Sequence, residues 1–136
     1  MAVLATFCCF LGGAYTAQSQ SIVGAWEVVA AERKSSPPQE MMGATVTLNA
    51  DLSFSIERPQ RNSWSGTYRV DAKAGTIDLA FRGRNLPRPH EGDVWEGIYR
   101  FSADGRLEIN TAQGLEARPV DFLPGYDLTL MTLRRK

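Results

Sequence analysis

The stretch from residue 64 to residue 81 reads WSGTYRVDAKAGTIDLAF, and its alternation decides the fold class. In an extended chain, successive side chains point to opposite faces, so residues two apart share a face. The polar DAKAG segment at residues 71–75 is typical of a hairpin turn. The stretch therefore predicts two antiparallel strands, and these side chains form their buried face: Trp64, Tyr68, Val70, Ile77, Leu79 and Phe81.

The same pattern recurs along the chain after residue 21. We expect strands over residues 22–33, 44–48, 52–56, 63–70, 76–81, 94–101, 106–110 and 127–133. In the third of these, Leu52, Phe54 and Ile56 are predicted to share the inner face. About eight short strands, without a sustained helical period, predict an all-β antiparallel barrel or sandwich. Gly66 and Gly97 lie inside strands and favour the sharp bends of a small closed barrel.

Composition is that of one ordinary globular domain. The chain has 136 residues, of which 43% are apolar and 22% charged. It has 15 basic and 15 acidic residues, and such a balance gives no global field to attract nucleic acid or an anionic membrane. We therefore expect no nucleic-acid partner.

The N-terminus predicts a signal peptide over residues 1–19, followed by a barrel domain over residues 20–136. Residues 3–17 are apolar and small, too short a run to span a bilayer comfortably. Ala17-Gln18-Ser19 resembles a small-x-small cleavage site, although no Lys or Arg precedes the apolar run. The alternatives are a buried first strand or helix, a retained anchor, or lipidation at Cys8 or Cys9. The signal-peptide interpretation predicts an exported protein, periplasmic or secreted, without a membrane span in the mature chain.

Gly24-Ala25-Trp26 resembles the Gly-x-Trp signature that opens lipocalins and their relatives. The resemblance implies a calycin-type barrel in which Gly24 and Trp26 close one end. In that superfamily an Arg near the final strand packs over the Trp ring. Arg134 is the first candidate for this role, and Arg135 is the second.

The chain from Ile22 to Leu133 also resembles a narrower group, an uncharacterised lipocalin-like domain family abundant in planctomycete-type bacteria. That family has no assigned activity, so the resemblance implies a fold and leaves the function open. The chain departs from it in the loop Arg82–Asp93, whose role we leave open. The ordered motifs that carry the resemblance are Val28-Val29-x-Ala31-Glu32, Gly66-Thr67-Tyr68, Thr76 to Leu79, Gly97-Ile98-Tyr99 and Asp104 to Leu107.

No motif predicts an enzyme. His90 is the only histidine, and with Glu91 and Asp93 it forms a loop cluster that lacks the spaced ligands of a zinc site. One loop His and no nucleophile elbow make a catalytic triad untenable. The sequence also has no glycine-rich phosphate loop. We expect no catalytic residue, metal or cofactor.

Inward aromatic side chains are the candidate ligand-binding residues. They fit two interpretations: the filling of a narrow barrel, or the wall of a cavity for one small hydrophobic ligand. These two interpretations lead to two hypotheses about function. The preferred hypothesis is an exported barrel that binds a small hydrophobic or amphipathic ligand. The alternative is a filled structural or protein-interaction module that uses the loops at residues 82–93 and 111–126. The candidate wall consists of Phe54, Trp64, Tyr68, Phe81, Trp95 and Tyr99.

Overall fold

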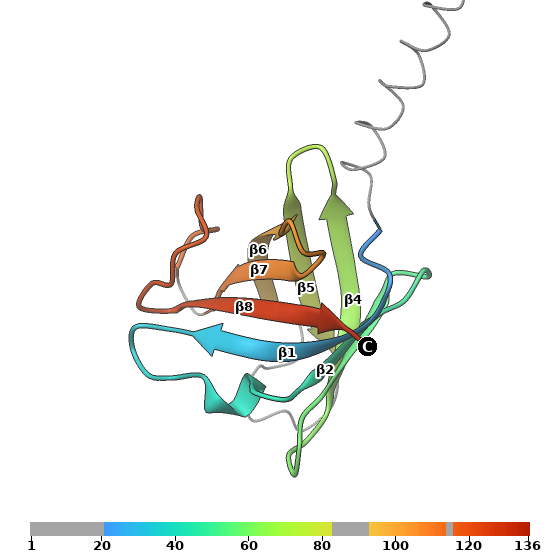
Figure 1. The fold of residues 1–136 in the computed structure, drawn as a ribbon, viewed down its shortest axis with the longest axis horizontal. Helices are drawn as coiled ribbons and strands as arrows, with labels where there is room; N and C mark the ends of the chain where they lie inside the picture. The colour runs from blue at the N-terminus through green and yellow to red at the C-terminus, as the bar shows by residue number, and fades with distance from the viewer. Residues whose placement is uncertain (1–20, 83–92, 114–115) are drawn as a thin grey trace, which may run out of the picture.

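Eight antiparallel strands close into a barrel in the computed structural model, which describes residues 21–82, 93–113 and 116–136 (Figure 1). Each strand pairs with the next in sequence, and β8 returns to pair with β1. No helix within these ranges is long and apolar enough to cross a membrane. The elements are β1 (Gly24–Glu32), the 3-10 helix η1 (Gln39–Met41), β2 (Thr45–Leu48), β3 (Ser53–Glu57), β4 (Trp64–Asp71), β5 (Thr76–Arg82), β6 (Val94–Phe101), β7 (Leu107–Ala112) and β8 (Leu128–Arg135).

The predicted all-β antiparallel barrel is confirmed, and one predicted inner residue is wrong. Leu52 lies in the turn before β3, with a φ of 72° and 51% of its surface exposed. Asp51 holds this turn by accepting hydrogen bonds from the backbone N–H and the hydroxyl of Ser53. Because of this turn, β3 begins at Ser53, one residue later than the apolar pattern suggests.

Alternation along the strands fills the interior with apolar side chains. Along β5, for example, Ile77, Leu79 and Phe81 are buried, whereas Arg82 is exposed. The interior of an eight-stranded barrel is just wide enough for side chains, so large apolar side chains fill it. The buried core cluster comprises Ile22, Trp26, Val28, Met41, Ala44, Val46, Leu48, Phe54, Ile56, Trp64, Tyr68, Ile77, Leu79, Phe81, Trp95, Leu107, Ile109, Met131 and Leu133.

The two ends of the barrel differ in their connections, because the strands run alternately up and down. Short turns at residues 49–52, 72–75 and 102–106 join strands at one end, which we call the turn end. The longer segments 33–44 and 113–127 leave from the other end, which we call the loop end. Figure 1 shows the β4–β5 turn and the β1–β2 connection on opposite sides of the barrel.

A β-bulge in β1 changes which of its side chains point inward. The pairing with β8 shifts between Val28 and Ala30. Before the shift Trp26 and Val28 face the core, and after it Ala31 does. Because the bulge adds one residue, the alternation is reversed beyond it. Arg33, two residues after Ala31, therefore faces the interior at the loop end.

The strands are strongly tilted. Followed once around the barrel, the paired residues return to β1 about 12 residues from the starting point. Side chains at one level along the barrel axis therefore come from positions that shift along the chain from one strand to the next. At the loop end, inward side chains of β4 to β8 form one layer with Arg33 and Gln113, which hydrogen bonds join to each other and to Thr129. This loop-end layer consists of Arg33, Trp64, Phe81, Trp95, Thr111, Gln113 and Thr129.

Candidate binding site

Trp26 seals the turn end. Its side chain is fully buried, and its indole Nε1 donates a 2.8 Å hydrogen bond to the carbonyl of Ile22. The guanidinium of Arg135 lies over the ring, with Cζ 4.1 Å from the centroid. Arg135 also donates to the carbonyls of Val23 and Ser21, each at 3.0 Å. The N-terminal segment, the indole and the end of β8 thus close this end together.

Assigning the closing cation to Arg134 is wrong, since Arg135 has that position. In the β1–β8 ladder, Trp26 lies opposite Arg135, whereas Glu27 lies opposite Arg134. Cross-strand partners point to the same face of the sheet. Arg134 therefore lies on the outer surface, where its guanidinium is 2.8 Å from the Glu27 carboxylate.

The closure of the turn end explains why residue 24 is a glycine. Its φ is +138°, a conformation that side-chain-bearing residues rarely adopt. A Cβ at this position would lie 2.7 Å from Nη1 of Arg135. The Gly of the Gly-x-Trp motif thus lets the guanidinium pass to the indole.

Four of the six candidate wall residues form one aromatic cluster. Phe81 is at its centre, with centroid distances of 5.3 Å to Phe54, 5.9 Å to Trp64 and 4.5 Å to Trp95. Trp64 and Trp95 meet edge to face at 5.7 Å. Such contacts stabilise a packed core beyond simple burial of apolar area. These rings therefore fill the barrel, with Trp64, Phe81 and Trp95 in its loop-end layer.

The two candidate tyrosines lie towards the turn end. Tyr68 donates its hydroxyl hydrogen to the Asn49 carbonyl at 2.7 Å, and burial raises its pKa above the ordinary value. Tyr99 meets Phe101 edge to face at 6.3 Å, and burial likewise raises the pKa of Tyr99. Phe101 in turn lies 6.3 Å from Trp26. Both tyrosines thus belong to the sealed end and lie away from the loop-end layer.

The polar half of the loop-end layer is absent from the sequence prediction. Thr111 and Thr129 are paired across β7 and β8, and both are fully buried. Arg33 reaches Thr129 Oγ1 at 3.4 Å and Gln113 Oε1 at 3.2 Å. Continuing the predicted alternation of Leu107 and Ile109 by two residues would have placed Thr111 on the inner face. No local pattern indicates that Arg33 faces inward, because its orientation depends on the bulge in β1.

Two buried polar atoms in this layer have no hydrogen-bond partner within the described part of the chain: Trp64 Nε1 and Thr111 Oγ1. Trp64 is 6% exposed and Thr111 is 0% exposed. A buried donor or acceptor without a partner carries a desolvation cost, so each such group calls for an explanation. One belongs to the aromatic half of the layer and the other to the polar half.

Arg58 follows β3 at the loop end, and its guanidinium lies over the Trp64 ring. Its Cζ is 3.8 Å from the Trp64 ring centroid, and its Nε donates to the Asn62 carbonyl at 2.9 Å. Burial lowers the pKa of Arg58, and the neighbouring charge of Arg61 adds to this. A guanidinium over an indole gains electrostatic attraction and covers apolar surface.

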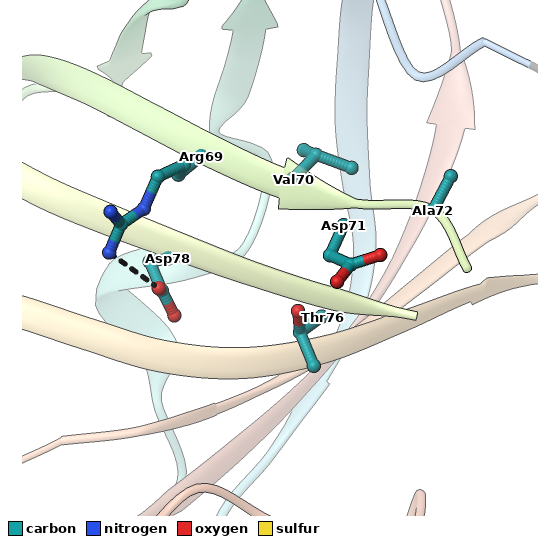
Figure 2. A pocket seen from close by; sticks show the side chains of 6 residues that line it. All are labelled: Arg69, Val70, Asp71, Ala72, Thr76 and Asp78. Atoms are coloured by element: carbon teal, nitrogen blue, oxygen red, sulfur yellow. Dashed lines mark ion pairs between the residues drawn. The ribbon is translucent and has the colours of Figure 1, made fainter. Parts of the chain in front are cut away.

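A surface hollow of about 410 Å³ lies on the outer wall near the β4–β5 turn. Figure 2 shows Arg69 reaching across to Asp78, at 3.6 Å, with Asp71 and Thr76 nearer the turn. Asp78 is also 2.8 Å from Arg118. Two cations thus already compensate the Asp78 carboxylate. The hollow is therefore a weaker candidate for a binding site than the loop-end layer.

Residues 116–127 lie against the outside of the barrel. Arg118 bridges Asp78 and Glu96, and the Asn110 amide donates to the carbonyls of Asp121 and Leu123 at 2.9 Å each. Ala112 and Leu130 are buried outside the main core cluster, on the outer face of β7 and β8. The segment itself exposes Val120, Leu123 and Tyr126.

Some predicted features lie outside the described residues: the signal peptide at residues 1–19 and the basic and histidine-containing part of the 82–93 loop, with Arg84, Arg88, His90 and Glu91. Among the residues described, no group of three His, Cys, Asp or Glu side chains is placed to hold a metal ion. No known protein family matches the chain, and no curated protein matches it. The geometry of the barrel is therefore the basis for a functional proposal.

Proposed function

We propose that the protein is a non-enzymatic, exported barrel that binds one small hydrophobic or amphipathic molecule at its loop end. The observation that carries the proposal is the pair of buried polar atoms without partners, Trp64 Nε1 and Thr111 Oγ1, in one layer beside the aromatic cluster. Ligand sites typically combine apolar walls with a few well-placed polar groups.

The sealed turn end supports the direction of binding. Trp26, Ile22 and Arg135 close that end with hydrogen bonds and ring contacts. At the loop end, by contrast, long connections leave the strands. A ligand that enters there would reach the aromatic rings of the loop-end layer, Trp64, Phe81 and Trp95, beside the Arg58 guanidinium that lies over Trp64.

Ligand titration tests the proposal. Intrinsic tryptophan fluorescence and thermal melting are measured against fatty acids, retinoids, sterols and haem. Saturable quenching and a raised melting temperature, both reduced in Trp64→Phe, are expected. If no ligand of these classes changes either signal, the binding proposal is refuted.

A protein-interaction module is the second candidate, and the segment at residues 116–127 favours it. The segment is held by the ion pairs of Arg118 and the amide of Asn110, yet it exposes three large apolar side chains. Exposed apolar side chains on an anchored segment are typical of contact surfaces. In this case Leu123→Ser and Tyr126→Ser would abolish a partner interaction and leave the ligand titration unchanged.

A further inference from the structure

Arg58 lies at the loop-end rim of the barrel, at a position that the alternation of β3 directs inward. Phe54 and Ile56 are the buried residues of β3, and Arg58 follows Ile56 by two residues. Ile56 pairs with Trp64, and the Arg58 Cζ lies 3.8 Å from the Trp64 ring centroid. Nε of Arg58 donates to the Asn62 carbonyl at 2.9 Å. The ring and the carbonyl together hold the guanidinium in one orientation.

The charge of Arg58 has no counter-ion among the residues that the structure describes. No carboxylate there lies within ion-pair distance, and no acceptor meets its Nη1 and Nη2 groups. Glu40 attracts Arg58 from farther away, but the Glu40 carboxylate is bound to Arg33 at 3.4 Å. Burial and the neighbouring charge of Arg61 lower the pKa of Arg58. An anion from outside would therefore stabilise the charged form of this side chain.

Arg33, at the same end of the barrel, is by contrast saturated by the protein. Its Nη1 donates to Gln113 Oε1 at 3.2 Å. Its Nη2 donates to Ser36 Oγ at 3.3 Å and to Glu40 Oε1 at 3.4 Å. Within residues 21–82, 93–113 and 116–136, Arg58 thus has Nη donors left for a ligand, whereas the Nη groups of Arg33 are occupied.

The ring beneath the Arg58 guanidinium adds a further donor. Trp64 Nε1 is buried, and it has no hydrogen-bond partner in the described part of the chain. An indole nitrogen donates and cannot accept. Unpaired donors of one guanidinium and one indole thus adjoin each other at this rim. Hydrogen bonds from a charged donor to an anion are stronger than those to a neutral acceptor, so this combination favours an anion.

We infer that the Arg58 guanidinium is a head-group site that takes a carboxylate, and that the ligand of the barrel is an amphipathic anion. The parallel N–H groups of a guanidinium match the two oxygens of a carboxylate. Arg58 is half-buried, so a head group can reach it at the rim without an internal cavity. This inference rests on the proposed binding function and specifies its ligand class.

Apolar surface for the body of such a ligand adjoins the same loop. Met42 is 44% exposed and directly precedes Gly43. A Cβ at Gly43 would lie 3.6 Å from Cγ of Pro59, the residue after Arg58. The unbranched Met side chain adapts to ligands of different shape. The rim thus places apolar contacts close to the cation.

A matched pair of probes tests the charge preference. The pair 2-naphthoate and 2-naphthamide shares one ring system, and at neutral pH it differs in an ionised carboxylate against an uncharged amide. Calorimetric titration of the full barrel at low salt should give about tenfold or more tighter binding of naphthoate. Added salt should reduce that ratio, because a half-exposed ion pair is screened. Acetate, which lacks the apolar body, should bind far more weakly than naphthoate.

Three variants identify the group responsible. Arg58→Gln should lower the affinity for naphthoate to that for naphthamide and leave naphthamide unchanged within about twofold. Arg61→Gln removes the same charge from an exposed position of the same loop, so it should weaken naphthoate by less than about threefold. Arg58→Lys keeps the charge and loses the planar fork, so it should give an intermediate affinity. This last variant keeps the test valid if Arg58→Gln unfolds.

The outcomes separate the inference from the function on which it rests. The inference is overturned if the two naphthalene probes bind equally, if acetate binds as tightly as naphthoate, or if Arg58→Gln leaves the naphthoate affinity unchanged. The binding function still stands in those cases when a member of the broader ligand panel binds. Failure of every probe and of that panel refutes both. A naphthoate preference that is lost in Arg58→Gln and kept in Arg61→Gln supports both.

Discussion

Replacement of Arg135 by Ala should destabilise the barrel clearly more than replacement of its neighbour Arg134. Arg135 covers the Trp26 ring and ties the N-terminal segment through Val23 and Ser21. Arg134 makes one ion pair, with Glu27, on the outer surface. The two residues are adjacent and identical in chemistry, so the comparison isolates position.

The expected magnitudes follow from these contacts. A cation–π contact at an exposed site contributes about 0.5–1 kcal/mol. Each hydrogen bond to a backbone carbonyl contributes about 0.5–1.5 kcal/mol. After allowance for the side-chain entropy that the variant regains, Arg135→Ala should lower the free energy of unfolding by about 2 kcal/mol. An exposed ion pair such as that of Arg134 is worth about 0.2–1 kcal/mol.

Urea unfolding, followed by tryptophan fluorescence, measures the difference. With a urea dependence of about 1–3 kcal/mol per molar, Arg135→Ala should lower the midpoint by about 1 M. Arg134→Ala should move it by less than half of that. If Arg134→Ala costs as much as Arg135→Ala, the closure of the turn end does not depend on the Arg135–Trp26 contact.

Three further outcomes are expected. Gly66→Ala should cost about 3 kcal/mol or more in urea unfolding, because its Cβ would lie 1.9 Å from a backbone carbonyl of β5; a stable variant would show that the two strands can separate. Burial raises the pKa of Tyr68 above 10.0, so the protonated form is favoured in the fold and stability should fall as pH rises above about 10. Tyr68→Phe should flatten that decline in melting temperature, and an unchanged slope would exclude Tyr68 as its source. Arg33→Met should cost about 2 kcal/mol or more by leaving Glu40 unpaired, whereas Lys34→Met, measured alongside by thermal melting, should be nearly neutral.

Strand positions were largely readable from local pattern. The predicted strand over residues 94–101 matches β6, and those over 76–81 and 44–48 differ from β5 and β2 by one residue. The last strand was predicted to end at Leu133, whereas β8 continues to Arg135. Arginines at a chain end resemble a solubilising tail, and only pairing with β1 makes them part of a strand.

Local chemistry by itself determined the all-β class, the antiparallel connections and which rings are buried, because alternation is a property of each strand alone. The tertiary structure decided the register between β1 and β8, and with it the choice of Arg135 over Arg134. It also decided, through the bulge between Val28 and Ala30, that Arg33 faces inward beside Thr129. Register and bulges arise from pairing between strands about 100 residues apart, so no window of the sequence contains them.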